Sequence, residues 1–137
     1  MSTFRLVTWF CTCLGLALLS RWQVLGARSA RCALDGSRIV KTYQVDLVRD
    51  GQATRSFCCV RCATEWPERS PPAAWLVRDE VTGQVLDATL ACFVESSAVT
   101  VPARHDRVHV FKRWPEAMQH IAEHGGARIV NPFDGED

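Results

Sequence analysis

The sequence predicts an α+β protein built of two small ββαβ units with mainly antiparallel sheets, preceded by an N-terminal membrane helix or signal. Short β-prone and helical segments follow the same order in both halves of the chain: strand, strand, helix, strand. Phe57 and Phe111 close the second strand of their halves, and each half has a Trp-Pro pair next to its helix. A long uncharged run precedes both halves. We therefore divide the chain into segments 1–27, 28–78, 79–131 and 132–137.

The first unit, 28–78, is punctuated by strong turn and breaker signals. Asp50-Gly51 is typical of a two-residue hairpin turn, and Pro67 ends the helix that precedes it. The expected elements are a strand at 39–48, a strand at 53–58, a helix at 60–65 and a strand at 75–77.

The second unit, 79–131, contains the clearest helix. Pro115 fits the first turn, Gly125-Gly126 ends the helix, and Ala117, Met118 and Ile121 form its apolar stripe. The expected elements are strands at 85–94, 107–111 and 127–130 and a helix at 114–124. The acidic tail that follows, 132–137, is expected to fray.

Segment 1–27 has the layout of a signal anchor or a signal peptide. Arg5 precedes fifteen uncharged residues, Leu6–Ser20, and Arg21 follows them. This run is shorter than the ~20 residues that usually cross a bilayer, although Arg21 can snorkel and Trp22 can extend the span. Both alternatives imply a membrane partner during targeting and place the rest of the chain in the periplasm or otherwise outside the cytoplasm.

Composition and motifs exclude several classes of function. Hydrophobic residues at 47% and charged residues at 23% exclude a disordered or fibrous chain. The net charge of +1 lacks the basic excess of a dedicated nucleic-acid binder. Motifs for hydrolases, phosphate loops and dinucleotide sites are missing, so we predict no enzyme and no small-molecule substrate. Asp79 and Glu80 lie beside a turn and are expected to be solvated.

Five of the seven cysteines lie beyond the uncharged run. Cys92 falls in an apolar strand and is expected in the core. Cys58, Cys59 and Cys62 lie where a strand gives way to a helix, and helix amides there favour the thiolate, which binds soft metals. Cys32 precedes the first strand and can return as a further sulfur. The pattern predicts a copper(I) or zinc site at an exposed corner, formed by Cys32, Cys58, Cys59 and Cys62.

Two other interpretations of these cysteines stay open. One is a structural disulfide of Cys32 with Cys59 or Cys62 in an oxidising compartment. The other is thiol-disulfide exchange through the Cys59-x2-Cys62 pair.

The histidines form two pairs spaced four residues apart and are additional candidate metal ligands. His120 and His124 share a face of the predicted helix, and His105 and His109 lie on or near a strand. His109 lies opposite Val108 and Val110 and is expected to point at water.

Several short motifs carry a resemblance to a known family. In the second half they are Asp79-x3-Gly83-x3-Asp87-Ala88, Ala91–Ser97, Thr100-Val101-Pro102, Val110-Phe111, Glu116-Ala117 and Gly125-Gly126. Their order resembles the NosL family of copper-binding accessory proteins. In the first half Cys32, Asp35-Gly36 and Phe57-Cys58-x3-Cys62 are similar to the cysteine-rich segment of NosL-like and TRASH-type metal-binding modules.

The resemblance implies a membrane-attached periplasmic protein of two ββαβ units. Such a protein supplies Cu(I) to a metal-receiving partner, nitrous oxide reductase. The chain departs from the family pattern at two places: it has Cys32-Ala33-Leu34-Asp35 in place of a cysteine-methionine motif, and Ala103 in place of a methionine after the proline. The thiolates of Cys58 or Cys59 and of Cys62, with Cys32, are therefore the first choice of ligands.

Overall fold

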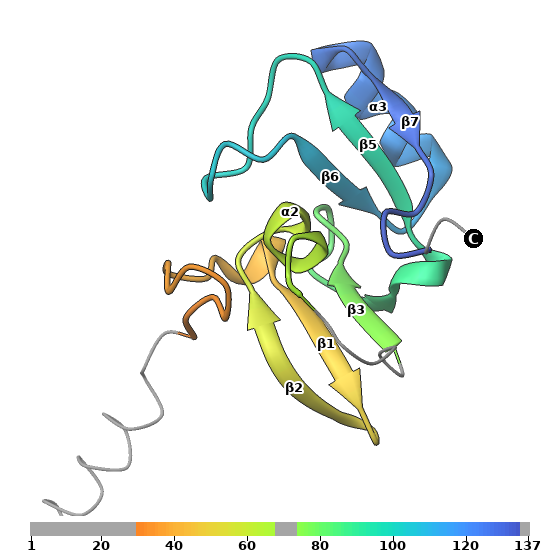
Figure 1. Cartoon of the computed structure of the whole chain (residues 1–137). Coiled ribbons are helices and arrows are strands. Elements are labelled where there is room, and N and C mark those ends of the chain that lie inside the picture. The colour runs from red at the N-terminus through yellow and green to blue at the C-terminus, as the bar shows by residue number, and fades with distance from the viewer. Residues whose placement is uncertain (1–29, 68–73, 135–137) are drawn as a thin grey trace, which may run out of the picture.

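The computed structural model describes residues 30–67 and 74–134 (Figure 1). Segment 1–27, expected to be a signal anchor or signal peptide, lies outside these residues. Within the two described ranges, no helix combines the length and the apolar character that a membrane span requires.

The α+β fold with two antiparallel sheets is confirmed. The first sheet has the order β2-β1-β3-β4 and the second the order β6-β5-β7, and every pairing is antiparallel. The strands are β1 (Val45–Arg49), β2 (Gln52–Phe57), β3 (Ala74–Arg78), β4 (Val85–Asp87), β5 (Cys92–Ser96), β6 (Val108–Phe111) and β7 (Gly126–Ile129). The helices are α2 (Val60–Thr64) and α3 (Trp114–His124), with short 3-10 turns η1 (Lys41–Tyr43) and η2 (Ala88–Leu90).

The hairpin between β1 and β2 follows the predicted turn. Asp50 and Gly51 both have positive φ, 52° and 73°, as a two-residue turn between twisted strands requires. The prediction of a strand over 39–48 was wrong in its first part, because η1 occupies Lys41–Tyr43 and β1 begins only at Val45.

The prediction of one strand over 85–94 was also wrong. Val85–Asp87 forms β4, which pairs with β3 in the first sheet, and η2 turns the chain before β5 begins. The Asp87 carboxylate accepts from the Thr89 N–H and hydroxyl and so holds this turn. A side chain that satisfies backbone donors in this way favours a turn over a continuous strand.

The second sheet is covered on both faces, as Figure 1 shows. Phe93 and Val110 face the main core, which contains the cysteines of the first half. Val94 and Phe111 face α3 and pack with its Ala117. Strands β5 and β6 therefore each contribute residues to both cores, whereas β7 lies at the edge of the sheet and is only partly buried.

Two expectations about surface residues were wrong. Met118 was assigned to the apolar stripe of α3 but is 46% exposed. The tail was expected to fray, but in its described part Phe133 stacks on Trp75, with ring centroids 4.8 Å apart, and packs edge-on against Phe93. Residues 135–137 lie outside the described ranges.

Candidate metal centre

The turn that carries Cys32 is a tight loop fastened to the first sheet. Within it, the Cys32 N–H donates to Ser37 O and the Gly36 N–H to Cys32 O, both at 2.9 Å. Gly36 has φ +73°, a left-handed conformation that glycine adopts readily. The Ala33 N–H donates to Ser56 O in β2, which brings Cys32 to the end of β2 where Cys58 lies.

The second cysteine segment is anchored by an aromatic side chain. Phe57 is fully buried and packs against Trp66 and Trp75, with centroids 5.6 and 5.9 Å away. Cys58 follows it directly, and Cys62 lies on the buried side of α2. The strand-to-helix transition therefore aims both thiols at the Cys32 turn.

Four potential ligands converge at this point: Cys32, Asp35, Cys58 and Cys62. Their ligand atoms all lie within 4.8 Å of one another. Cys58 Sγ is 3.4 Å from Cys62 Sγ, and Cys62 Sγ is 3.7 Å from Asp35 Oδ2. Ligand atoms around a tetrahedral zinc with Zn–S of about 2.3 Å lie roughly 3.8 Å apart, so this arrangement has the dimensions of a soft-metal site.

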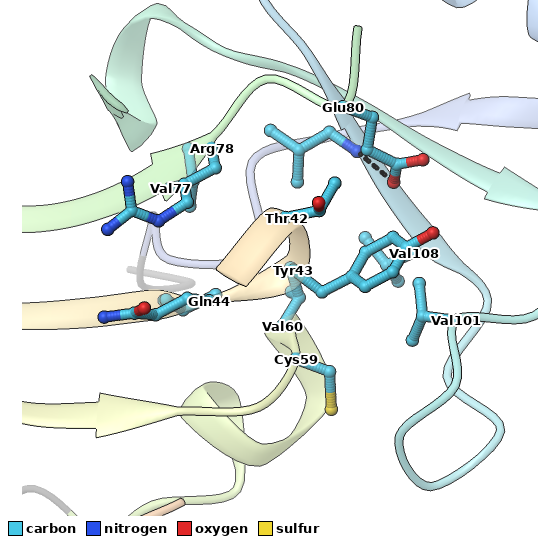
Figure 2. A pocket seen from close by; sticks show the side chains of 12 residues that line it. Thr42, Tyr43, Gln44, Cys59, Val60, Val77, Arg78, Glu80, Val101 and Val108 are labelled. Carbon is cyan, nitrogen blue, oxygen red and sulfur yellow. Dashed lines mark hydrogen bonds between the residues drawn. The ribbon is translucent and has the colours of Figure 1, made fainter. Parts of the chain in front are cut away.

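Cys59 lies beside this group of four and is not a member of it. Its Sγ is 3.9 Å from Cys58 Sγ, and the residue lines a crevice between the two halves with Tyr43, Val101 and Val108 (Figure 2). The crevice has a volume of about 10 Å³, roughly the least that holds one water molecule. The position of Cys59 is thus that of a core residue next to the site.

The sulfur atoms are buried, which corrects the expectation of an exposed corner. Cys58 and Cys62 have no exposed surface, Cys59 is 1% exposed and Cys32 is 4% exposed. Burial raises the pKa of Cys32 and of Cys62 and raises that of Cys59 to about 12. The expected stabilisation of thiolates at the helix start is therefore outweighed by desolvation, and metal binding has to release protons from these thiols.

Two charged and partly exposed side chains flank Cys62 on the solvent side. Asp35 is exposed, and Arg104 Nη1 lies 3.8 Å from Cys62 Sγ and 2.9 Å from Glu65 Oε2. Hydrogen bonds from Ser37 hold the pKa of Asp35 down at about 2. Approach to the sulfurs from water therefore leads past a carboxylate and a guanidinium.

The histidines do not join the cysteines in the described part of the chain. His105 is exposed and lines an open groove with Arg61 and Thr64. His109, His120 and His124 form a row, with ring centroids 4.5 Å apart for the first pair and 4.8 Å for the second.

His109 was expected to point at water, but it is 1% exposed because α3 covers its face of the sheet. Its Nδ1 faces the Glu80 carboxylate at 2.9 Å and its Nε2 faces Val99 O at 3.2 Å. Burial lowers the pKa of His109, but the hydrogen bond and charge of Glu80 outweigh this and raise it above its usual value. With both nitrogens engaged, His109 is a structural residue.

Two further acidic residues were expected to be solvated and have structural roles. Asp79 has no exposed surface and accepts from Thr82 and from the Lys112 N–H, while Glu80 binds His109. Both carboxylates connect the turn after β3 to the end of β6.

Sequence reasoning missed Asp35 and Arg104. Asp35 had a usable signal, since the spacing Cys32-x2-Asp35 followed by a glycine matches the short ligand spacing of metal-binding turns. Arg104 had none, because its proximity to Cys62 spans 42 residues of sequence.

Comparisons with known proteins agree with this fold. No protein-family model and no curated protein matches the chain. Among solved structures, the chain is similar to the copper chaperone NosL from Shewanella denitrificans, with a TM-score of 0.63 and 20% identity. The match covers 74% of this chain and 86% of that chain. The resemblance drawn from the sequence motifs is confirmed at the level of the fold.

Proposed function

We propose that this protein binds a soft metal ion, copper(I) in the first place, through Cys32, Cys58 and Cys62 and passes it to a protein partner by ligand exchange. The observation that carries the proposal is the convergence of three sulfur atoms from two separate segments within 4.8 Å. Soft thiolates favour copper(I) and zinc over hard cations. The shared fold with a copper chaperone supports copper as the cargo.

The proposal includes a location and a partner. The apolar run Leu6–Ser20 between Arg5 and Arg21 tethers the protein to the membrane, with the metal centre outside the cytoplasm. A metal held by buried thiols leaves by stepwise exchange, in which incoming ligands replace the cysteines one at a time. The receiving protein implied by the NosL resemblance is nitrous oxide reductase.

The test is a copper(I) titration of the reduced full-length chain in detergent, under anaerobic conditions, against a chromophoric chelator. Cys58→Ser and Cys62→Ser should each weaken copper(I) binding by more than about 100-fold, because residues in the outer shell of a site alone contribute about 10–100-fold. Cys92→Ser is the matched control, since Cys92 is a half-buried cysteine that packs against the cluster of Val94, Phe111 and Ala117.

Circular dichroism of each variant shows whether the fold is retained. Equal affinity in the wild type and both site variants, or no binding by any of them, removes the proposal. A loss of binding by Cys92→Ser of the same size would assign the effect to general damage rather than to the site.

A second candidate function is thiol-disulfide exchange. The observation that favours it is the 3.4 Å separation of Cys58 Sγ and Cys62 Sγ, which makes these two the reactive pair in place of Cys59 and Cys62. It predicts a Cys58–Cys62 disulfide that forms and breaks in a glutathione buffer, detected by thiol alkylation and peptide mass spectrometry. A metal chaperone without this activity keeps both thiols alkylatable throughout the same buffer range.

A further inference from the structure

Asp35 occupies the place of a fourth ligand in the metal centre. It follows Cys32 after two intervening residues, the spacing at which a short turn presents two cysteines to a structural zinc. Here a carboxylate stands where the second thiolate of such a turn would lie. The turn is closed by the Gly36 N–H to Cys32 O hydrogen bond, so both side chains emerge on the side of Cys58 and Cys62.

Ser37 fixes the orientation of this carboxylate. Asp35 Oδ1 accepts from the Ser37 N–H at 2.9 Å and from the Ser37 hydroxyl at 2.7 Å. The other oxygen, Oδ2, lies 3.7 Å from Cys62 Sγ. One oxygen is thus held by Ser37, while the other faces the sulfur atoms, which is how outer-shell hydrogen bonds orient a monodentate ligand.

We infer that Asp35, positioned by Ser37, is the ligand by which this centre distinguishes zinc(II) from copper(I). The inference rests on the proposed metal-binding function and assigns its metal selectivity. Zinc(II) takes four ligands in a tetrahedron and accepts carboxylate oxygen beside sulfur. Copper(I) is softer and selects the thiolates alone. The same four groups therefore offer zinc a complete coordination shell and offer copper three sulfurs with a neighbouring anion.

The charge of the four groups also favours zinc(II) over copper(I). Three thiolates and one carboxylate carry four negative charges, of which zinc(II) neutralises two and copper(I) one. The carboxylate of Asp35 therefore stabilises the bound divalent ion more than the bound monovalent ion. Arg104, whose Nη1 is 3.8 Å from Cys62 Sγ, offsets part of the remaining charge for both metals.

The experiment measures zinc(II) and copper(I) affinities of the reduced full-length chain by chelator competition. Asp35→Asn should weaken zinc binding by about 10–100-fold and leave copper(I) binding within about 3-fold of the wild type or tighter. Ser37→Ala, which keeps the backbone donor to Asp35, should weaken zinc by about 10-fold and spare copper. Asp50→Asn is the control, because Asp50 is exposed at the far end of the β1–β2 hairpin.

A second measurement uses cobalt(II) as a spectroscopic probe of the zinc site. Asp35→Cys should add a fourth thiolate, increase the intensity of the sulfur-to-cobalt charge-transfer band, and bind zinc more tightly than Asp35→Asn. An unchanged band would mean that position 35 does not reach the metal and would overturn the inference.

The outcomes separate the two proposals. If the wild type binds copper(I) and the zinc-to-copper affinity ratio is the same in Asp35→Asn, the inference is wrong and the proposed function stands. Equal weakening of both metals has the same consequence. If the wild type binds neither metal, both proposals are wrong.

Discussion

Asp106 provides a sharp test of how the second half of the chain supports the metal centre. Cys59 is the N-cap residue of α2, but its side chain makes no capping hydrogen bond. Instead, Asp106 Oδ2 accepts from the Arg61 N–H at 2.9 Å across a separation of 45 residues, and Oδ1 accepts from the Val108 N–H at 3.1 Å. A carboxylate from the loop before β6 therefore caps the helix that carries Cys62.

The size of the expected effect follows from these two bonds. Asp106 is 4% exposed, so water does not replace a lost acceptor. In Asp106→Asn one oxygen remains, while the amide NH₂ faces a backbone N–H. Hydrogen bonds to charged groups contribute about 1.5–3 kcal/mol, so we expect the free energy of unfolding to fall by about 2–4 kcal/mol. Metal affinity should fall as well, because α2 is no longer held against the Cys32 turn.

The assay is urea denaturation of the metal-free reduced chain, followed by tryptophan fluorescence. The matched control is Asp87→Asn, because Asp87 also accepts a backbone N–H, from Thr89, but through a local turn with a partly exposed side chain. The control should lose about 1 kcal/mol. A loss below about 0.5 kcal/mol for Asp106→Asn, or one no larger than the control, would refute the role of Asp106 as a cap supplied from a distant segment.

Three further predictions concern stability and are checked by the same denaturation assay. The raised pKa of His109 adds stability below the ordinary histidine pKa, and this stability is lost as the pH rises through the higher pKa of the folded state. Glu80→Gln should therefore flatten the fall in unfolding free energy above about pH 6.5, and parallel curves for the two proteins would contradict this. Phe57→Ala should cost about 3–5 kcal/mol by leaving a cavity between two tryptophans, and a loss below about 1 kcal/mol would show that the aromatic cluster does not anchor the cysteine segment. Gly126→Ala should lower the free energy of unfolding more than Gly83→Ala, because a Cβ at position 126 would lie 2.2 Å from a backbone oxygen of β5. A Cβ at position 83 would meet no atom, and its positive φ alone costs about 1–2 kcal/mol. Equal losses would contradict the close approach of β7 to β5.

Residue patterns correctly predicted those elements whose ends are set by neighbouring residues in the sequence. Helix α3 begins and ends where Pro115 and the two glycines indicated, and Asp50-Gly51 forms the predicted hairpin. Both signals act within a few residues through φ preferences and end effects, so the sequence contains all the information they need.

The errors arose where a distant segment decides the outcome. Alternation along β6 placed His109 on the face opposite Val110 but contained nothing about the helix that covers that face. Likewise, residues 85–87 do not continue into β5 as one long strand, because they pair with β3 at the edge of the first sheet. Periodicity identifies the face of a strand, whereas the burial of that face depends on packing partners that are remote in the sequence.

For the candidate site too, the sequence predicted local features correctly and features that depend on distant segments incorrectly. Spacing predicted that Cys58, Cys59 and Cys62 lie together with Cys32. The structure brings Cys58 and Cys62 close to Cys32 through the turn at Gly36, and it leaves Cys59 beside them. The exposure of the site was predicted incorrectly, because a strand-to-helix junction is exposed only when nothing packs on it. Here the loop before β6 packs on it, with Arg104 Nη1 3.8 Å from Cys62 Sγ and Asp106 bonded to the Arg61 N–H.

If the proposed function holds, this division provides a route by which a buried centre can release its metal. The proposed ligands all belong to the first half, whereas Arg104, which lies beside Cys62, and Asp106, which caps α2, belong to a single loop of the second half. Arg104 and His105 both have positive φ, near 51° and 52°, a conformation that costs non-glycine residues free energy and persists only while the loop is held by its contacts. A partner that competes for Arg104 or its neighbour Glu65 would loosen that loop and expose Cys62 without unfolding either sheet. Release of the metal would then require the displacement of one loop, and the two sheets would stay intact throughout the transfer.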